Sequence, residues 1–340
     1  MQANLTRRAR FTIADVARRA GVSVGTVSNV LSNPRAVRAQ TRRRVEVAIA
    51  ELNYRPNRIA QSLSRRHTNI VGMVVPDISN PFFSELMLGV EHVLNAADYA
   101  VVFGNAHDDA AKQRRYFDGF RERRVDGMVI AITPGTEIED VASVGADLPV
   151  VMVDRTLSGW HGDEVVGDNA AGMEMAVAHL YQLGHRRLAL VNGETRLSTA
   201  AQRSEGFERA LRARGLSPVL LSVGSFTLES GFAQAAQLFS MAQRPTGICA
   251  GNDLLAMAVI AAANEYGLRV PEDLSVVGYD DITYARLVSP SLTTVRQSAY
   301  SMGTEAARLL MERISGRRSS DRVTVLRPEF VVRRSAGPAP

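Results

Sequence analysis

From Ile70 onwards, short runs of β-branched and apolar residues alternate with longer stretches whose apolar residues recur at helical spacing. The strand-like runs are IVGMVV, AVVFG, DGMVI, PVVMVD, LALVN, GICAG and SVVGYD, with another near Val219, and helices are expected over 82–97, 109–123, 169–183, 201–214, 229–241 and 253–266. Parallel strands need crossover connections, and the alternation supplies a helix for each. The chain is therefore predicted to be α/β. About 250 residues with a break near 155–168 predict two doubly wound parallel-sheet lobes.

Polar residues follow many of these predicted strands. They are Asp77, Asp154, Asn192, the pair Asn252 and Asp253, and the pair Asp280 and Asp281. Ligands bind open α/β sheets beyond the carboxyl ends of strands, so five such ends in one chain favour a shared polar cleft over ordinary turn residues. The sequence has no Gly-rich phosphate loop, HExxH helix or GxSxG elbow, and its histidines lack metal-ligand spacing. The cleft is expected to bind a ligand rather than catalyse a reaction, with no cofactor and no metal.

The segment from Phe11 to Arg66 has a different pattern. Thr12 and Asp15 are spaced as in a capping box, and apolar residues then recur at helical spacing until Gly21, which suits a helix end. Ser23 is suited to cap a second helix. The inward positions would be Ile13, Val16, Ala17 and Ala20 in the first helix, and Val27, Val30 and Leu31 in the second. Two short helices joined by a Gly-containing turn are the helix-turn-helix pattern.

The second helix of this pair would present Val24, Gly25, Ser28 and Asn29 outward, near its N-terminus. That end of a recognition helix reaches base edges in the major groove. Asn29 has the donor and acceptor that read adenine, Val24 offers an apolar contact for a thymine methyl, and Gly25 allows a close backbone approach. The alternative is a small helical bundle that binds nothing.

Charge favours the nucleic-acid interpretation of this bundle. Residues 1–68 hold fourteen arginines against three acidic residues, a net charge of +11, whereas the rest of the chain carries −6. A basic head on a mildly acidic body is the electrostatic footprint of a module that binds a polyanion. A third helix is expected over 39–52, in which the arginines at 42–44 are either phosphate contacts or a solvated face.

Cysteine content and the length of the apolar runs indicate in which cellular compartment the protein works. Cys249 is the only cysteine, which excludes an internal disulfide and a multi-cysteine metal site. The apolar runs have the length of strands, and none approaches a membrane span. Arg7 and Arg8 resemble the start of a twin-arginine export signal, but charged residues interrupt the apolar region that would have to follow. A cytoplasmic protein without a membrane partner is expected.

Both parts of the chain carry motifs of one family. In order they are TIADVARRAGVSVGTVSNVLSNP, ELNYRPNRIAQSL, VPDISNPFF, GHRRLALVNG, QRSEGF, AGNDLLAMA and VPEDLSVVGYDD, followed by LTTVRQ. Through them the chain resembles the lac/gal repressor family of bacterial transcription regulators from residue 12 to residue 335. The resemblance implies a homodimer that binds palindromic double-stranded operator DNA. It also implies a small-molecule effector, typically a carbohydrate, in the cleft of a periplasmic-binding-protein-like body.

The resemblance also implies domain boundaries. A helix-turn-helix DNA-binding headpiece would cover 1–56, a hinge helix and linker 57–68, and a two-lobed effector-binding and dimerisation domain 69–335. The chain would cross between the lobes three times. The resulting N-lobe would consist of 69–160 and 292–322, and the C-lobe of 161–290 and 323–335.

The functional positions of the family match this sequence residue by residue. Its DNA contacts fall on Thr12, Ser23, Val24, Gly25, Thr26, Ser28 and Asn29 in the headpiece, and on Asn57, Arg58, Ala60 and Leu63 in the hinge. Leu63 matches the leucine that the family wedges into the minor groove. Its effector contacts fall on Phe82, Phe83, Asp154, Arg155, Arg203, Phe226, Asn252 and Asp280. This set has the chemistry of a polyol site, since carboxylates and an Arg fork pair with hydroxyls and aromatic rings cover C–H faces.

Three features depart from the family's pattern. Arg38 stands where a small capping residue usually begins the third helix, which predicts a weaker helix start. Arg155 and Arg203 together predict a cleft more cationic than a neutral sugar needs, so an acidic or phosphorylated sugar is an alternative ligand. The tail from Arg327 onwards has no heptad repeat, which predicts a dimer without a coiled-coil tetramer tail.

Three other functions share parts of this pattern. A sugar-transport receptor would have the two-lobed body but not the basic head. An enzyme with a DNA-binding head would need a nucleophile or a catalytic carboxylate pair, which the sequence does not indicate. A DNA-binding regulator whose body contacts a protein corepressor in place of a small ligand stays open. The leading prediction is a repressor controlled by a small molecule.

Overall fold

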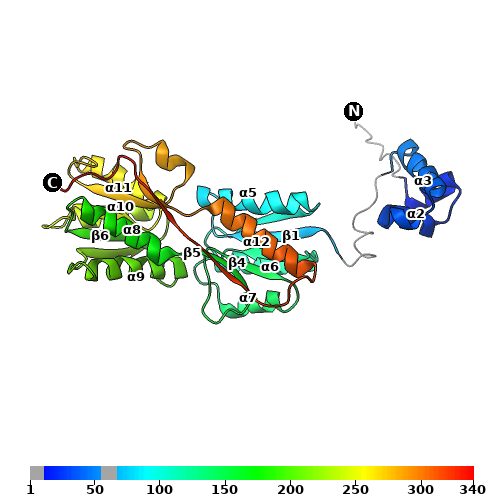
Figure 1. Ribbon diagram of the computed structural model, residues 1–340, viewed down its shortest axis with the longest axis horizontal. Helices are drawn as coiled ribbons and strands as arrows, with labels where there is room; N and C mark the ends of the chain where they lie inside the picture. The colour runs from blue at the N-terminus through cyan, green and yellow to red at the C-terminus, as the bar shows by residue number, and fades with distance from the viewer. Residues whose placement is uncertain (1–10, 55–66) are drawn as a thin grey trace, which may run out of the picture. The chain divides into compact units, whose positions relative to one another are not determined.

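The structure is a computed structural model that describes residues 11–54 and 67–340 (Figure 1). It divides into two compact units, 1–68 and 69–340, which are described separately. The predicted hinge helix lies outside the described residues, and so do its predicted DNA contacts Asn57, Arg58, Ala60 and Leu63. Among the helices of the described ranges, none has the combination of length and hydropathy that a bilayer span requires.

The first unit is a three-helix bundle. Helices α1 (Ile13–Ala20), α2 (Val24–Ser32) and α3 (Ala39–Glu51) are joined by a turn and by the short 3-10 helix η1 (Pro34–Ala36). The capping box of Thr12 and Asp15 is present, and Gly21 ends α1 with a φ of 64°. One valine from each helix is fully buried at the centre: Val16, Val27 and Val45. The predicted helix-turn-helix is confirmed.

Helix α3 contributes an arginine to the packing of this bundle. The Arg44 guanidinium donates to the carbonyl oxygens of Ala20 and Gly21, at the end of α1 where backbone carbonyls lack intrahelical partners. The helix dipole also favours a cation there. Arg44 and its neighbour Arg43 are both exposed, but Arg44 has a structural role through these hydrogen bonds to the end of α1. The Arg38 side chain makes no capping hydrogen bond, in agreement with a weak start of α3.

Arg44→Ala is expected to lower the free energy of unfolding of this bundle by about 1 kcal/mol, because hydrogen bonds from a charged donor are lost at a partly exposed site. Arg43→Ala should change it by less than about 0.5 kcal/mol, since this side chain is exposed. Amide hydrogen exchange of α1 and α3 in the full chain measures both effects. Equal protection in the two variants would contradict the role assigned to Arg44.

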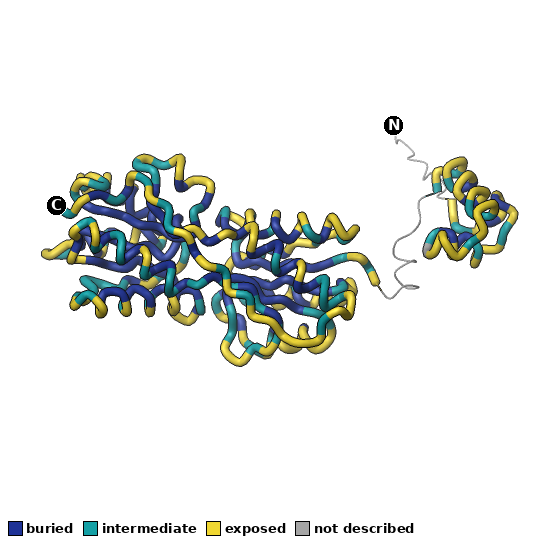
Figure 2. Tube along the Cα trace, in the orientation of Figure 1, coloured by how far each residue is buried: buried dark blue, intermediate teal, exposed yellow. Residues whose placement is uncertain are grey.

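The second unit contains two six-stranded sheets, each covered by helices on both faces, so that the central strands are buried while the edge strands and the outer helix faces are more exposed (Figure 2). We call the first the N-lobe. Its sheet is parallel with the order β11-β5-β4-β3-β1-β2. The strands are β1 (Ile70–Val75), β2 (Ala100–Asn105), β3 (Gly127–Ile130), β4 (Val150–Val153), β5 (Asp163–Gly167) and β11 (Val323–Leu326). Its helices are α5 (Pro81–Ala96) and α12 (Ala299–Ile314) on one face, and α6 (Ala110–Glu122) and α7 (Ile138–Gly145) on the other.

The C-lobe repeats this architecture. Its sheet has the order β12-β10-β9-β8-β6-β7, parallel except for β12, which runs antiparallel to β10. The strands are β6 (Leu188–Gly193), β7 (Leu220–Gly224), β8 (Gly247–Ala250), β9 (Ser275–Asp280), β10 (Thr293–Arg296) and β12 (Glu329–Val331). Its helices are α8 (Asn169–Gln182) and α9 (Ser198–Arg212) on one face, α10 (Leu228–Phe239) and α11 (Asp253–Glu265) on the other, and the short 3-10 helix η2 (Thr283–Arg286). The predicted pair of doubly wound lobes is confirmed.

The chain passes between the two sheets three times, and we name these segments the first (167–169), second (297–298) and third (327–328) crossovers. Their positions correct the predicted lobe boundaries. Strands β5 and β11 pair within the N-lobe sheet, not the C-lobe, and β10 pairs within the C-lobe sheet, not the N-lobe. These three strands were not among the predicted ones, and local sequence could not assign them to a lobe because their pairing partners are distant in sequence.

Candidate functional site

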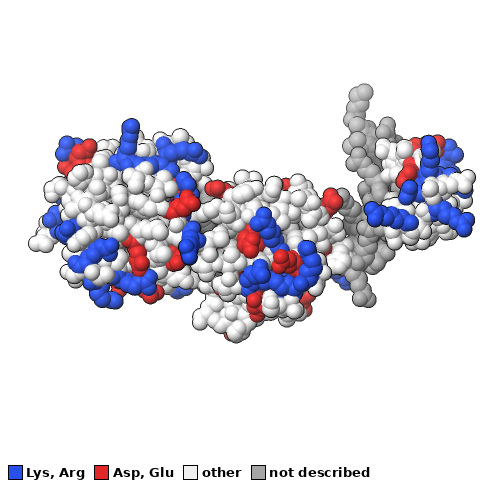
Figure 3. All heavy atoms as spheres, in the orientation of Figure 1, with Lys and Arg blue, Asp and Glu red and all other residues white. Residues whose placement is uncertain are grey.

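The first candidate site is the outward surface of α2. Val24 is 45% exposed, Gly25 and Asn29 are exposed, and Ser28 is half-buried, while the opposite side of the helix faces the core of the bundle. Basic side chains are visible on the surface of this unit (Figure 3). Gly25 and the three side chains predicted to face outward are therefore accessible to a partner on one side of α2.

Three of the predicted DNA contacts have hydroxyls that also hold the helix starts. The Thr12 hydroxyl donates to Asp15 Oδ2 over 2.7 Å, and these hydrogen bonds lower the pKa of that carboxyl. Ser23 Oγ accepts from the Thr26 backbone N–H at 3.1 Å and lies 2.9 Å from the Thr26 hydroxyl. Remaining N–H groups at a helix N-terminus favour an anion, and contact of these residues with DNA stays a prediction.

The second candidate site is a cavity between the lobes, and all eight predicted effector residues line it. The N-lobe supplies Phe82, Phe83, Asp154 and Arg155, and the C-lobe supplies Arg203, Phe226, Asn252 and Asp280. Three further lining residues escaped the sequence analysis: Asn80, Thr199 and Gln297. The cavity has a volume of about 20 Å³, which is room for a single water. The cavity must therefore widen before it can hold a sugar.

Aromatic rings from both lobes line this cavity. Asn80 caps α5, and Pro81 occupies its first position, so Phe82 and Phe83 follow at the helix start directly beyond β1. Their rings meet edge to face with centroids 5.2 Å apart. Phe226 comes from the other lobe, and the Arg155 guanidinium stands 5.6 Å from the Phe83 ring and 5.7 Å from the Phe226 ring.

Asp154 and Arg155 follow β4 directly. Asp154 has a left-handed backbone (φ 65°), and Arg155 Nε is 3.6 Å from its carboxylate. Burial raises the pKa of Asp154 and lowers the pKa of Arg155. Arg155 donates to the Ile132 carbonyl at 3.1 Å, but its Nε is buried without a hydrogen-bond partner. An unpaired buried donor is costly, which marks Nε as a group that a ligand would satisfy.

Arg203, on α9, is held on several sides. Its Nε donates to Asn169 Oδ1 at 2.9 Å and its Nη1 to the Gly251 carbonyl, while the guanidinium lies 4.0 Å from the Tyr279 ring centroid. Its Nη2 is 3.7 Å from Asp280 Oδ1. The side chain is 4% exposed, so this guanidinium is a rigid donor.

Asp280 ends β9 with a left-handed backbone (φ 112°). Its Oδ1 accepts from Gln297 Nε2 at 2.9 Å. Burial raises the pKa of this carboxyl to about 7, against the opposing effect of Arg203. Gln297 Oε1 is buried and has no partner. Gln297 stands directly beyond β10, so the strand-end rule would have found it had this strand been recognised.

The charges of the cavity compensate each other. Two carboxylates, Asp154 and Asp280, face two guanidinium groups, Arg155 and Arg203, and the other lining side chains are neutral. Each arginine lies beside an aspartate, so the positive charge that the sequence predicts is offset when both carboxylates are ionised. Because the pKa of Asp280 is raised to about 7, this balance is complete only above neutral pH, and an acidic or phosphorylated sugar stays an alternative ligand.

Some polar strand ends do not reach the cavity. Asp77 accepts from the backbone and hydroxyl of Ser79, and Asn192 donates to the Ala200 carbonyl and to Ser204 Oγ. Asn252 does line the cavity, although its Oδ1 caps α11. The neighbouring Asp253 and Asp281 hold the β9 end: Asp253 accepts from Ile282 N–H and Thr294 Oγ1, and Asp281 pairs with Arg296 and Arg333.

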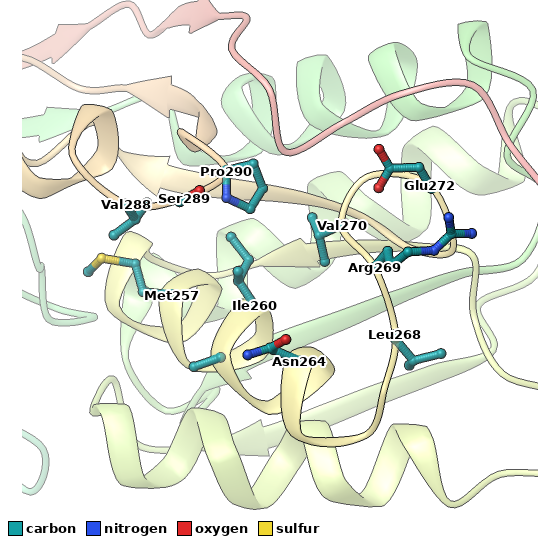
Figure 4. A pocket seen from close by; sticks show the side chains of 11 residues that line it. Met257, Ile260, Asn264, Leu268, Arg269, Val270, Glu272, Val288, Ser289 and Pro290 are labelled. Atoms are coloured by element: carbon teal, nitrogen blue, oxygen red, sulfur yellow. The ribbon is translucent and has the colours of Figure 1, made fainter.

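The C-lobe also carries a larger hollow of about 580 Å³, beside α11 (Figure 4). Aliphatic side chains such as Met257, Ile260 and Val270 make up much of its wall, and the guanidinium of Arg269 is paired with Asp273. Its polar groups do not converge on a common point as those of the interlobe cavity do. Among the described residues, no group of three or more His, Cys, Asp or Glu is placed to hold a metal.

Each of the two units contains a segment that matches a family model. Residues 12–57 match the model described as "Bacterial regulatory proteins, lacI family", and residues 177–336 match a "Periplasmic binding protein-like domain".

Individual relatives cover nearly the whole chain. The HTH-type transcriptional repressor PurR of Erwinia tasmaniensis is 37% identical over 97% of this chain and 98% of its own, and the ribose operon repressor of Bacillus subtilis is 38% identical over 88% and 90%. The lac repressor dimer bound to operator and the anti-inducer ONPF is similar in structure, with a TM-score of 0.87, 28% identity and coverage of 97% and 100%. A LacI family regulator from Enterococcus faecium with bound ribose has a TM-score of 0.71, 32% identity and coverage of 80% and 100%.

Proposed function

The chain belongs to the LacI family of bacterial regulatory proteins and is a DNA-binding transcriptional regulator, and we propose that its interlobe cavity takes a neutral sugar of pentose size as effector. In this proposal the protein is a repressor that acts in the cytoplasm, where its operator DNA lies. It binds a palindromic operator as a homodimer, which the solved lac repressor dimer bound to operator supports.

The charge balance of the cavity is the observation that carries the sugar assignment. Two carboxylates and two guanidinium groups offer paired acceptors and donors for neighbouring hydroxyls, and their charges balance when both carboxylates are ionised, as they are once a ligand hydroxyl donates to Asp280. Three phenylalanines supply apolar faces for the C–H side of a ring. The cavity must open to admit a ligand and would close around it, as two-lobed binding proteins do by hinge motion.

The relatives weigh against the other functions. The proteins to which the chain is similar over most of its length are transcriptional repressors, which argues against a transport receptor and against an enzyme with a DNA-binding head. The solved relative with bound ribose supports control by a small molecule. The alternative of a protein corepressor is therefore not retained.

A ligand screen tests the sugar assignment directly. Thermal unfolding of the full chain is followed with D-ribose, D-xylose, D-glucose, D-ribose 5-phosphate and adenine. A ligand at a hundred times its Kd should stabilise the folded chain by about 2.7 kcal/mol. We expect stabilisation by a neutral pentose, with D-ribose as the first probe. Binding of the phosphorylated sugar alone, or of adenine alone, would contradict the assignment.

Effector binding is expected to weaken as the pH falls below 7. Because the pKa of Asp280 is raised to about 7, the free protein holds a proton on this carboxyl at lower pH. A ligand hydroxyl that donates to Asp280 favours the ionised form, so binding must release that proton. Apparent affinity should fall up to about tenfold per pH unit below 7 and level off above it. Calorimetry in buffers of different ionisation enthalpy measures the proton release, and a flat pH profile would contradict the role of Asp280.

Asn29→Ala is expected to weaken binding to the specific operator by about 1–3 kcal/mol while leaving binding to random DNA nearly unchanged, because a base-edge contact is lost. Arg43→Ala should instead weaken both alike and flatten the salt dependence, if this exposed side chain contacts phosphate. Fluorescence anisotropy with operator and scrambled duplexes separates the two effects. Equal losses on both duplexes for Asn29→Ala would refute base reading by this residue.

A further inference from the structure

We propose that Asn169 is a positioning residue that holds Arg203 in place for the effector and links it to the crossovers between the lobes. This inference rests on the proposed function of the cavity. Asn169 does not line the cavity, and the sequence analysis did not single it out. It is the first residue of α8 and is 2% exposed.

One end of the Asn169 amide faces the effector site. Its Oδ1 accepts from Arg203 Nε at 2.9 Å. The rest of the guanidinium is held by the Gly251 carbonyl and the Tyr279 ring, so that only the edge near Asp280 is left for a ligand. Asn169 therefore helps to set the direction in which Arg203 presents its donors.

The other end of the amide faces the first crossover. Its Nδ2 donates to the Gly167 carbonyl at 3.1 Å and to Gln202 Oε1 at 3.0 Å. Gly167 is the last residue of β5, in the N-lobe sheet, whereas Asn169 begins a C-lobe helix. The amide thus spans the point at which the chain leaves one lobe for the other.

The other two crossovers meet the first one here. A Cβ on Gly167 would come within 2.6 Å of Gln297 Oε1, so the side chain of the second crossover packs directly on this glycine. Gln297 in turn donates to Asp280. The Asp168 N–H donates to the Leu326 carbonyl at 3.0 Å, at the start of the third crossover. A rotation of the lobes about these segments would shift Asn169 and Gln297. Through their hydrogen bonds, these two residues would in turn shift Arg203 and Asp280.

Only an amide serves both ends of this contact. Arg203 needs an acceptor and the Gly167 carbonyl needs a donor, so aspartate keeps the first interaction and loses the second, while alanine loses both. Aspartate is also compatible with the first turn of α8, where the helix dipole favours a negative charge. The two substitutions therefore separate the contact to Arg203 from the contact to the crossover.

The experiment compares Asn169→Ala, Asn169→Asp and Gln202→Ala with the unmodified full chain. Gln202→Ala is the matched control, because it removes the exposed partner of the same Nδ2. Calorimetry measures the affinity for D-ribose, anisotropy measures the operator affinity with and without D-ribose, and circular dichroism checks folding. The ratio of the two operator affinities reports the coupling between ligand and DNA.

We expect Asn169→Ala to bind D-ribose at least tenfold more weakly, and Asn169→Asp and Gln202→Ala to bind it within threefold of the unmodified chain. Asn169→Asp should nevertheless reduce the coupling ratio at least fivefold, which a merely structural residue would not do once binding is restored. Unchanged affinity in Asn169→Ala, equally weak binding in Asn169→Asp, or full coupling in Asn169→Asp would overturn the inference. If D-ribose does not bind the unmodified chain, the same comparison is made with the neutral pentose that does; failure of the unmodified chain to bind any neutral pentose would instead overturn the sugar assignment, and the inference with it.

Discussion

Asp280→Asn is expected to weaken effector binding by about 100-fold, equivalent to about 3 kcal/mol. The carboxylate is buried, accepts from Gln297 and faces Arg203, so it offers the ligand an acceptor that is already held in place. Asparagine keeps the volume and tolerates the left-handed backbone at this position. Its amide, however, must turn an NH₂ group either toward Arg203 or toward the ligand. Calorimetry with the best ligand of the screen measures the loss, and circular dichroism verifies the fold.

Asp77→Asn is the matched control for this substitution. Asp77 also follows a parallel strand and accepts from nearby groups, but it does not line the cavity. Its replacement should change effector affinity by less than about twofold, as for a surface substitution. Comparable affinities for the Asp77 and Asp280 variants would show that the carboxylate of Asp280 does not contact the effector.

Gly303→Ala is expected to lower the free energy of unfolding by about 3 kcal/mol, because it forces apart two closely packed helices. A Cβ on Gly303 of α12 would lie 2.1 Å from the Leu86 carbonyl oxygen of α5, and a Cβ on Gly89 of α5 would lie 2.2 Å from the Tyr300 carbonyl oxygen. These are backbone atoms, which cannot rotate away as a side chain does. The single tryptophan, Trp160, packs against the N-lobe core and so reports urea unfolding of this lobe by fluorescence.

The same substitution at another helical glycine should have the opposite sign. A Cβ on Gly119 of α6 would approach only the end of the flexible Arg123 side chain, at 3.0 Å. Gly119→Ala is therefore expected to raise the free energy of unfolding by about 0.5–1 kcal/mol through helix propensity. If Gly303→Ala and Gly119→Ala lowered the free energy of unfolding by similar amounts, the close approach of α5 and α12 would not be the reason for glycine at position 303.

The sequence by itself determined the features that depend on neighbours a few residues away. The capping box at Thr12 and the helix end at Gly21 are contacts within one turn, and the structure contains both. The polar residues of the cleft were also predictable. Asp154, Asn252 and Asp280 each follow a buried parallel strand, and the carboxyl ends of such strands lie at one edge of a sheet.

Features that depend on distant partners needed the folded chain. The strands β5, β10 and β11 were not predicted from the sequence, and their pairing assigns them to lobes. Gln297 and Asn169 became visible as site residues because crossovers that are far apart in the chain meet beside Arg203 and Asp280. Two arginines in a sequence predict a cationic cleft, but a buried guanidinium is stable only beside a compensating charge or acceptor. Which carboxylate supplies that compensation is fixed by the folded geometry, not by spacing along the chain.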